Sequence, residues 1–181
     1  MVKGSLHIRR AFTDDAQLLS ALSAVTFFDT FNGTCTDEDI QGFIETCFNP
    51  EQVYKELQDT NDFYFIAFID KDAVGYIRLK EEVSDVEVIN KNRGIELKRI
   101  YVLKEYHSQK IGAELMAFAL DFATEKNYEL IWLGVWEHNE KAKAFYKKFG
   151  FEDTGVTHLF PIGNTPQTDK WLIKFIGKRV L

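Results

Sequence analysis

The segment EYHSQKIGAEL, residues 105 to 115, joins a strand-like run to a helix-like run. The first turn of a helix leaves several backbone N–H groups without acceptors and carries about half a positive charge. A diphosphate fits such a turn, Gly112 lets an anion approach the backbone closely, and Lys110 adds a positive charge. Every strand–helix unit has a turn of this kind, so the segment alone also fits an ordinary connection.

The segment NEKAKAFYKKFGF, residues 139 to 151, carries a second set of polar residues that can do chemistry. Asn139 is suited to cap a helix, and Gly150 is suited to end it. Tyr146 shares the apolar face of that helix, where a tyrosine is usually part of the core. Its phenol, with a pKa of about 10, stays protonated at neutral pH and can also donate a proton.

The apolar pattern predicts the elements that must hold these segments. Strand-like runs lie at residues 6–12, 62–69, 74–80, 95–103, 130–136, 158–160 and 170–176, and helix-like runs at 13–27, twice within 29–59, at 111–127 and at 139–150. Thr13 or Asp14 is suited to cap the first helix. The order strand–helix–strand–helix after residue 95 requires a parallel strand pair. We therefore expect an α/β fold of the α+β type, with a mixed, mostly antiparallel sheet around a central parallel pair, flanked by helices.

Composition excludes several classes of protein. The net charge of −6 argues against nucleic acid as a partner and permits a cationic one. The longest apolar runs, such as FYFIAFI, are far shorter than the roughly 20 residues that span a bilayer. Cys35 and Cys47 give neither a disulfide framework nor a metal-ligand spacing, and the first residues lack the apolar core of a signal peptide. We expect a cytoplasmic protein without metal, membrane or nucleic acid.

The two segments together resemble a known family. Residues 139 to 151 have the form N-x-x-A-x-x-F-Y-x-x-x-G-F, preceded by LIWLGVW and by the turn at 105–115, and this arrangement resembles the GNAT superfamily of N-acetyltransferases. TFFDTFNGT, LKRIYVL, IWLGVWEHNEKAKAFYKKFGF and the late QTD are similar to the PaiA-type spermidine/spermine N-acetyltransferases. The resemblance implies the GNAT fold, one N-acetyltransferase domain over residues 1–181, and acetyl-coenzyme A (acetyl-CoA) as co-substrate.

The resemblance also implies roles for individual residues. Strand-like pairing of the pantetheine arm falls on Ile100, Tyr101 and Val102. The pyrophosphate loop falls on His107, Ser108, Gln109, Lys110, Ile111 and Gly112, followed by Ala113. Asn139 falls where the family contacts the cofactor amide, Tyr146 where it has its general acid, and Lys148 within reach of the adenosine phosphates.

Two loop positions depart from the family pattern Gln/Arg-x-x-Gly-x-Gly/Ala. His107 replaces Gln or Arg, and Lys110 replaces the first Gly. Because the family contact is made mostly by backbone N–H groups, side-chain changes need not abolish it, and a lysine is tolerated if its φ is negative. We expect the departures to alter affinity rather than the identity of the co-substrate.

The reaction needs a base and an acid. At pH 7 only about one amine in 2,500 is neutral, so deprotonation costs roughly 4.6 kcal/mol, which a carboxylate can lower. Glu96 is the first candidate base, although it can equally be a solvated strand residue, and Glu137 is the second. Transfer of a proton from Tyr146 to a thiolate is uphill by roughly 2 kcal/mol. A backbone N–H near Val102 is expected to stabilise the carbonyl oxygen.

Residues 29–59 contain eight acids and one base, Lys55. In the GNAT fold this segment overhangs the acceptor site, where an acidic rim attracts a polycation, although solvated helices often carry such charge too. Asp29, Asn32 and Glu137 are the candidate substrate contacts. We predict direct acetyl transfer to a primary amine of a small polyamine. A protein or peptide amine, another small amine, or a non-catalytic acyl-CoA sensor are the alternatives, and a homodimer is compatible with the resemblance.

Overall fold

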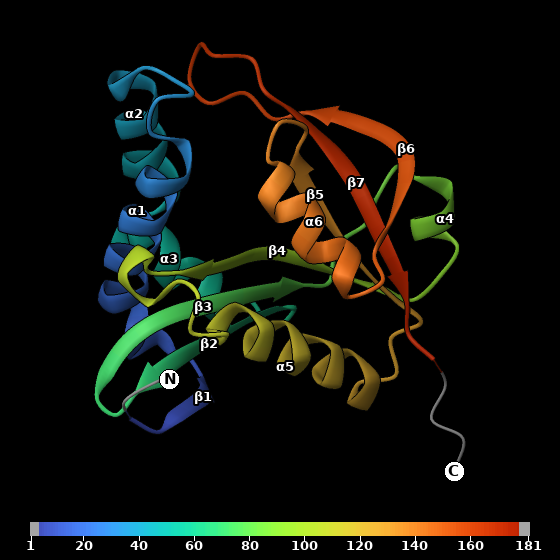
Figure 1. Cartoon of the computed structure of the whole chain (residues 1–181), viewed down its shortest axis with the longest axis horizontal. Coiled ribbons are helices and arrows are strands. Elements are labelled where there is room, and N and C mark those ends of the chain that lie inside the picture. Colours follow the sequence, from blue (N-terminus) through green and yellow to red (C-terminus); the bar gives the residue numbers. More distant parts are fainter. Residues whose placement is uncertain (1–3, 178–181) are drawn as a thin grey trace.

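The computed structural model describes residues 4 to 177 and contains a seven-stranded sheet with helices on both faces (Figure 1). The strands are β1 (Leu6–Arg10), β2 (Asp62–Ile69), β3 (Asp72–Lys80), β4 (Gly94–Val102), β5 (Leu130–Trp136), β6 (Glu152–Leu159) and β7 (Thr168–Phe175), in the order β1-β2-β3-β4-β5-β7-β6. Among the strands of residues 4–177, only β4 and β5 pair in parallel. The predicted mixed sheet with a central parallel pair is confirmed.

The helices are α1 (Ala16–Phe31), α2 (Asp37–Cys47), α3 (Pro50–Gln58), α4 (Glu87–Asn90), α5 (Ile111–Glu125) and α6 (Glu140–Lys148), with short 3-10 turns η1 (Thr13–Asp15) and η2 (Lys104–Tyr106). Helices α1 and α3 pack on β2–β4 from one face, and α5 packs on β3–β5 from the other (Figure 1). Asn49 caps α3, because its side chain accepts from the N–H of Gln52. Among residues 4–177, no helix is long and apolar enough to cross a bilayer.

Three local expectations are wrong. Residues 81–94, where the apolar pattern predicts neither a strand nor a helix, contain the short α4, whose Ile89 is buried against Trp132. Neither Thr13 nor Asp14 caps α1, since both lie in η1 and the N-cap residue is Asp15. Strand β6 begins at Glu152 rather than at residue 158. It is a mostly exposed edge strand without the apolar alternation that would reveal it.

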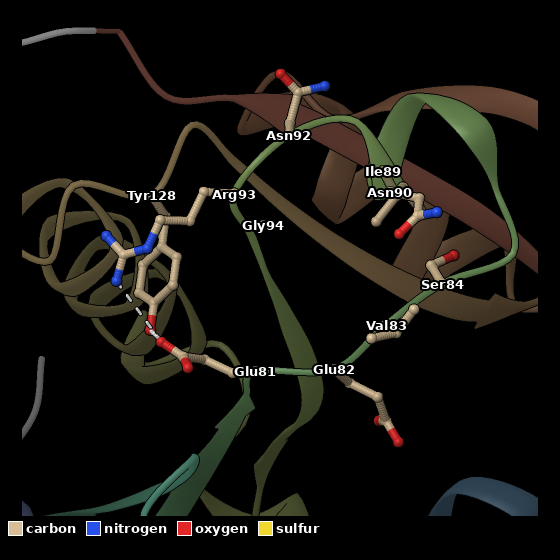
Figure 2. Close-up of a pocket in the computed structure, with 10 residues that line it drawn as sticks. All are labelled: Glu81, Glu82, Val83, Ser84, Ile89, Asn90, Asn92, Arg93, Gly94 and Tyr128. Carbon is tan, nitrogen blue, oxygen red and sulfur yellow. Dashed lines mark hydrogen bonds and ion pairs between the residues drawn. The ribbon is translucent and has the colours of Figure 1, made fainter.

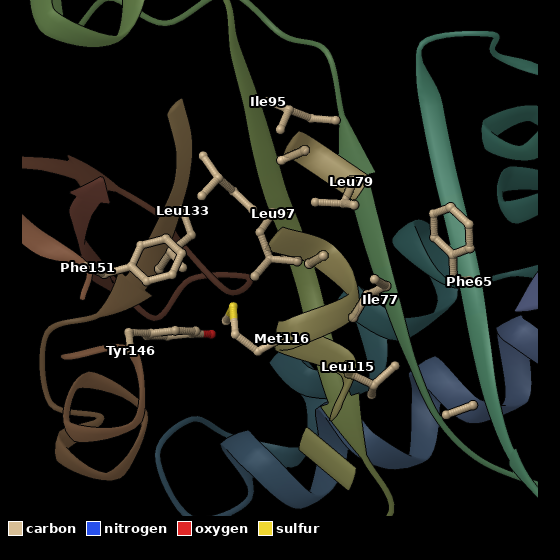
Figure 3. Close-up of a cluster of buried hydrophobic side chains, with 14 of the residues drawn as sticks. Phe65, Ile77, Leu79, Ile95, Leu97, Leu115, Met116, Leu133, Tyr146 and Phe151 are labelled. Carbon is tan, nitrogen blue, oxygen red and sulfur yellow. The ribbon is translucent and has the colours of Figure 1, made fainter. Parts of the chain in front are cut away.

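Large apolar side chains fill the space between the sheet and α5. Leu79, Leu97 and Leu133 from three strands meet Leu115 and Met116 from α5 (Figure 3). Each fully buried leucine contributes about 1.5–3 kcal/mol relative to an exposed one. This core fixes α5, and therefore the turn in front of it, against β4.

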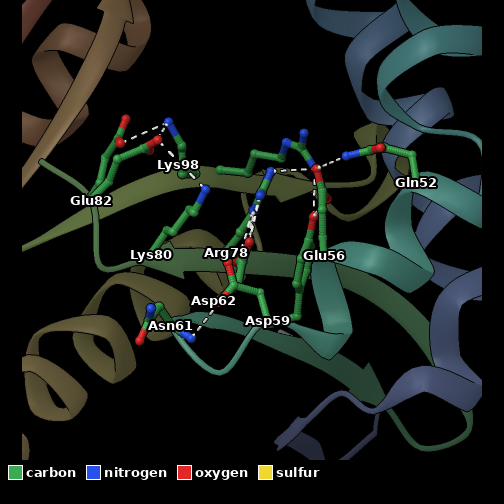
Figure 4. Close-up of polar contacts among 12 residues, drawn as sticks. Gln52, Glu56, Asp59, Asn61, Asp62, Arg78, Lys80, Glu82 and Lys98 are labelled. Atoms are coloured by element: carbon green, nitrogen blue, oxygen red, sulfur yellow. Dashed lines mark hydrogen bonds and ion pairs between the residues drawn. The ribbon is translucent and has the colours of Figure 1, made fainter.

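Buried ion pairs hold α3 on the opposite face (Figure 4). Arg78 on β3 lies 2.6 Å from Asp62 and 3.0 Å from Glu56 of α3, and Arg99 on β4 donates to the Tyr64 hydroxyl at 2.7 Å. Burial alone would raise the pKa of Glu56, but the charges of Arg99 and Arg78 outweigh it and hold that pKa below its usual value. Removing one partner would leave a buried charge uncompensated, so this network constrains the position of α3.

Candidate active site

The central parallel strands form a fork. Pairing between β4 and β5 covers only Gly94–Glu96 and Leu130–Trp132, although β4 continues to Val102 and β5 to Trp136. On its other side, β4 remains paired with β3 as far as Val102. The unpaired side of β4 therefore faces the gap of the fork. Residues 100 to 102, predicted to pair with a pantetheine arm, lie on this stretch.

The turn after β4 presents backbone N–H groups. Helix α5 begins at Ile111, and within residues 4–177 the N–H groups of residues 108 to 112 donate no hydrogen bond. Ser108 and Lys110 both have φ of +66°, in the left-handed region. Successive N–H groups in such alternating conformations form an anion-binding concavity. The condition under which a lysine is tolerated here, a negative φ, is not met: the lysine adopts the backbone that the family's glycine would adopt without strain.

His107 and Gly112 complete the turn. The His107 Nε2 atom lies 2.9 Å from the carbonyl oxygen of Val102. Because a carbonyl only accepts, Nε2 carries the hydrogen, and the ring ties the turn to the end of β4. A Cβ added at Gly112 would make only ordinary contacts, at 3.9 Å, with Phe145 and Val102. Packing within the described residues therefore does not require glycine there, which leaves approach of a ligand as its use.

Tyr146 is buried on α6, with its ring edge-on to Phe151 at 5.8 Å between centroids. Figure 3 shows its hydroxyl pointing toward Met116 of α5. Burial, and then the charge of Asp169, raises the pKa of Tyr146, so the hydroxyl stays protonated. Asn139 caps α6, since its Oδ1 accepts from the N–H of Ala142 at 3.0 Å.

Glu96 lies at the closed end of the fork. It is buried, and Lys98 lies 2.9 Å from its Oε2 atom. Lys98 also lies 2.6 Å from Glu82 (Figure 4). Burial raises the pKa of Glu96 to about 7 against the opposing charge of Lys98. Glu137 follows β5 at the opposite, open end of the fork, so the two candidate bases occupy different places.

The remaining sequence candidates lie on the surface around the fork. Asp29 and Asn32 are exposed at the end of α1, and Lys148 is exposed in the last turn of α6.

The loop before β7 is held on α2, because Asp39 accepts from the Asn164 N–H at 3.0 Å and from the Thr165 hydroxyl at 2.7 Å. These contacts lower the pKa of Asp39. Asp39 is therefore a structural contact rather than a free member of the acidic rim.

Asp169 is a further candidate site residue, which the late QTD segment contains but to which the sequence assigned no role. It lies on β7 opposite Trp136, and its Oδ1 is buried without a hydrogen-bond partner among the described residues. Its Oδ2 would lie only 3.1 Å from a Cβ at Gly134. The sequence signal is Gly134 itself, since an isolated glycine in a buried strand marks a close approach.

Other unpaired atoms share that face of the sheet. Within residues 4–177, the indole Nε1 atoms of Trp132 and Trp136 and the Nδ1 of His158 are also buried without hydrogen-bond partners. All three residues and Asp169 lie on the face opposite α5, since the alternate residues of β5 and β7 belong to the α5 core. Buried polar groups are normally paired, so this face has capacity to bind a polar ligand or water.

A separate cavity of about 380 Å³ lies where β4 begins, lined by residues 81–84, 89–90, 92–94 and Tyr128 (Figure 2). There Arg93 stacks over the Tyr128 ring at 4.5 Å, and Tyr128 donates to Glu81. None of the candidate site residues lines it. Among the described residues, no group of three metal-ligating side chains comes together there or elsewhere.

A forked sheet, free N–H groups at a helix start and a buried protonated tyrosine form a candidate site with the capacity to bind an anionic group and to donate a proton. Residues 27–151 match the model of the acetyltransferase (GNAT) family, and the chain belongs to that family. Membership in the GNAT family confirms the predicted fold. It also confirms the predicted enzyme class, which is an N-acetyltransferase that uses acetyl-CoA.

Two sequence relatives extend over most of the chain. An uncharacterized N-acetyltransferase of Lactobacillus delbrueckii subsp. lactis is 34% identical over 154 residues, covering 85% of this chain and 88% of its own. The spermidine N(1)-acetyltransferase of Thermoplasma acidophilum is 30% identical over 156 residues, covering 83% and 91% respectively.

The fold is similar to that of solved N-acetyltransferases. The PaiA N-acetyltransferase of Thermoplasma acidophilum, solved in complex with coenzyme A, superposes with a TM-score of 0.77 at 23% identity, over 94% of this chain and 99% of that one. A GCN5-related N-acetyltransferase of Rhodopseudomonas palustris superposes with a TM-score of 0.75 at 15% identity, over 97% and 98%. At these identities the likeness concerns the fold.

Proposed function

We propose that this chain acts as a single N-acetyltransferase domain in the cytoplasm and transfers acetyl from acetyl-CoA to a primary amine of a small polyamine. The observation that supports acetyl transfer is the fork between β4 and β5. The free N–H groups of residues 108 to 112 and the protonated Tyr146 both lie near this fork. The 30% identity to a spermidine N(1)-acetyltransferase supports a polyamine as the acceptor.

The co-substrate would lie along the unpaired side of β4. The backbone of Ile100 and Val102 would pair with the pantetheine arm, and the N–H groups from Ser108 to Gly112 would bind the diphosphate at the start of α5. Asn139 would contact the amide, with Lys148 near the adenosine phosphates. Since the Asn139 Oδ1 is occupied as a helix cap, its amide hydrogens are the groups left for that contact.

Tyr146 would protonate the leaving thiolate. Its raised pKa guarantees a protonated hydroxyl but makes it a weaker acid, so the reaction depends on the same burial also destabilising the thiolate. Glu96, the base inferred from sequence, remains a candidate. Its carboxylate is already paired with Lys98, which would compete with an incoming ammonium group.

The acceptor would enter beneath α1 and α2. Asp29 near the end of α1, and Asp37 and Glu38 in the first turn of α2, form an exposed acidic edge there. The amide of Asn32 lies close to Asp29 in sequence and is a further candidate contact. Such an edge raises the local concentration of a polycation, and the effect weakens with salt. An amine at the end of a basic peptide would be attracted in the same way, and it is the second candidate acceptor.

The experiment is a thiol-release assay with acetyl-CoA and a panel of spermidine, spermine, small monoamines and lysine-rich peptides. We expect the polyamines to give the highest kcat/KM, with a KM that rises with ionic strength. Faster release with the peptides would assign the peptide as acceptor. Tight acetyl-CoA binding without release for any amine would instead identify a sensor.

A further inference from the structure

Asp169 has no counter-charge in the described chain. No lysine or arginine of residues 4–177 forms an ion pair with it, whereas Glu96, Glu56 and Asp62 each have one. Its Oδ1 is buried and accepts no hydrogen bond from the described residues. A carboxylate oxygen that is buried without a partner is costly, so the binding of a cation there would stabilise the site.

The surroundings of Asp169 place it beside the fork. On β5, Gly134 leaves its side chain room, and Trp136 is its register partner. The titratable groups around it are His158 from β6, which is its cross-strand partner, and the hydroxyls of Tyr146 from α6 and Tyr101 from β4, which lie within range of its charge. Tyr146 and Tyr101 lie near enough that its charge raises the pKa of both hydroxyls, after the larger effect of their burial.

None of these neighbours supplies a positive charge. The tyrosines are neutral, and the pKa of His158 is lowered, first by burial and then by the charge of Lys98. Burial raises the pKa of Asp169 itself to about 6. A base in that range is ionised at pH 7 and still a useful proton acceptor.

We propose that Asp169 is the carboxylate that binds the acceptor ammonium group and accepts a proton from it. The proposal rests on the acetyl transfer proposed above, and it assigns to Asp169 the role that the sequence suggested for Glu96. The two residues lie on different strands, and only Asp169 contributes charge to the surroundings of Tyr146.

The step balances as follows. Asp169 takes one proton from the ammonium group and releases it to water. The neutral nitrogen attacks the acetyl carbonyl carbon, the C–N bond forms and the C–S bond breaks. Tyr146 gives its proton to the thiolate, and a second proton from the nitrogen restores the phenol. The products are the N-acetyl amine, free coenzyme A thiol and one proton.

The test compares Asp169→Asn, Glu96→Gln and the control Asp153→Asn, with spermidine as the amine, or with the best amine of the panel if spermidine is not acetylated. Asp153 lies on the neighbouring β6 and pairs at the surface with Lys170. We expect Asp169→Asn to lower kcat/KM by about 100-fold or more and to abolish the fall in rate toward acid pH, because the general base is gone. Its dissociation constant for acetyl-CoA should change by less than about twofold.

Activity of Asp169→Asn within about threefold of wild type, or an acid limb that vanishes in Glu96→Gln instead, would overturn the assignment. If Asp169→Asn does not fold, Asp169→Ala with added formate provides the second test. If formate restores activity, the proposal is supported. If formate does not restore activity, the proposal is contradicted. If the wild-type protein acetylates no amine at all, the proposed function fails, and this inference fails with it.

Discussion

Replacing Lys110 with glycine should stabilise the protein. Lys110 has φ of +66° and ψ of 4° at the N-cap of α5, a conformation that costs an L-residue about 1–2 kcal/mol. Glycine removes that cost, but it also increases the entropy of the unfolded chain, which destabilises the folded protein by roughly 0.5–1 kcal/mol. The expected net gain is about 0.5–1 kcal/mol, or a rise in Tm of about 1–4 °C for a chain of this size.

The measurement is thermal unfolding of wild type, Lys110→Gly and the matched control Lys126→Gly. Lys126 is exposed at the other end of α5, but its φ is −83°, so glycine relieves nothing there and should lower Tm. A fall in Tm for Lys110→Gly as large as that of Lys126→Gly would refute the assigned conformation of the turn.

Lys110→Gly also tests whether the side-chain charge of Lys110 contributes to the binding of acetyl-CoA. If Lys110 adds a point charge to the diphosphate site, its loss should weaken acetyl-CoA binding by about two- to fivefold, the value of one surface charge near a helix start. A change of less than about twofold in Lys110→Gly and in His107→Gln would mean that the backbone alone holds the diphosphate.

Further predictions concern three residues. Gly112→Ala should raise Tm by about 1–4 °C, because alanine in a helix is favoured over glycine by roughly 0.5–1 kcal/mol and its Cβ meets nothing closer than 3.9 Å. It should nevertheless weaken acetyl-CoA binding by about tenfold or more in calorimetry, and unchanged affinity would remove Gly112 from the site. Tyr146→Phe should lower kcat by about 100-fold with a smaller effect on KM, and an unchanged kcat would exclude it as the acid. The pKa of Glu96 is about 7 when folded and about 4.3 when unfolded, so the folded protein favours its protonated form and loses stability as pH rises from about 4.3 to 7. Glu96→Gln should remove this loss, so denaturant unfolding at pH 5 and 8 should differ less for the variant than for wild type; an equal difference would contradict the burial argument.

Regular elements with a clear apolar period were predictable from sequence. The run LIWLGVW is almost entirely buried as β5, and Ile111, Leu115 and Ala119 bury one face of α5 as their spacing predicts. Helix α4 could not be predicted in this way, because its four residues are too few to show an apolar period. Its position instead depends on the packing of Ile89 against Trp132.

The site was predictable where a motif fixes a residue in one element and unpredictable where packing brings elements together. The N-cap role of Asn139 follows from its place before α6. The left-handed φ of Lys110 contradicts its residue type, and such violations concentrate at functional turns. Asp169 gains its position from β7 lying beside β5, a pairing between segments far apart in the sequence.

The most direct test of the central claim is mass spectrometry of a reaction of the purified protein with acetyl-CoA and spermidine. Acetyl transfer predicts monoacetylated spermidine and free coenzyme A thiol in equal amounts, with both reduced together in Tyr146→Phe. Release of thiol without an acetylated amine, or neither product from spermidine or any other amine offered, would contradict the assignment of this chain as a polyamine N-acetyltransferase.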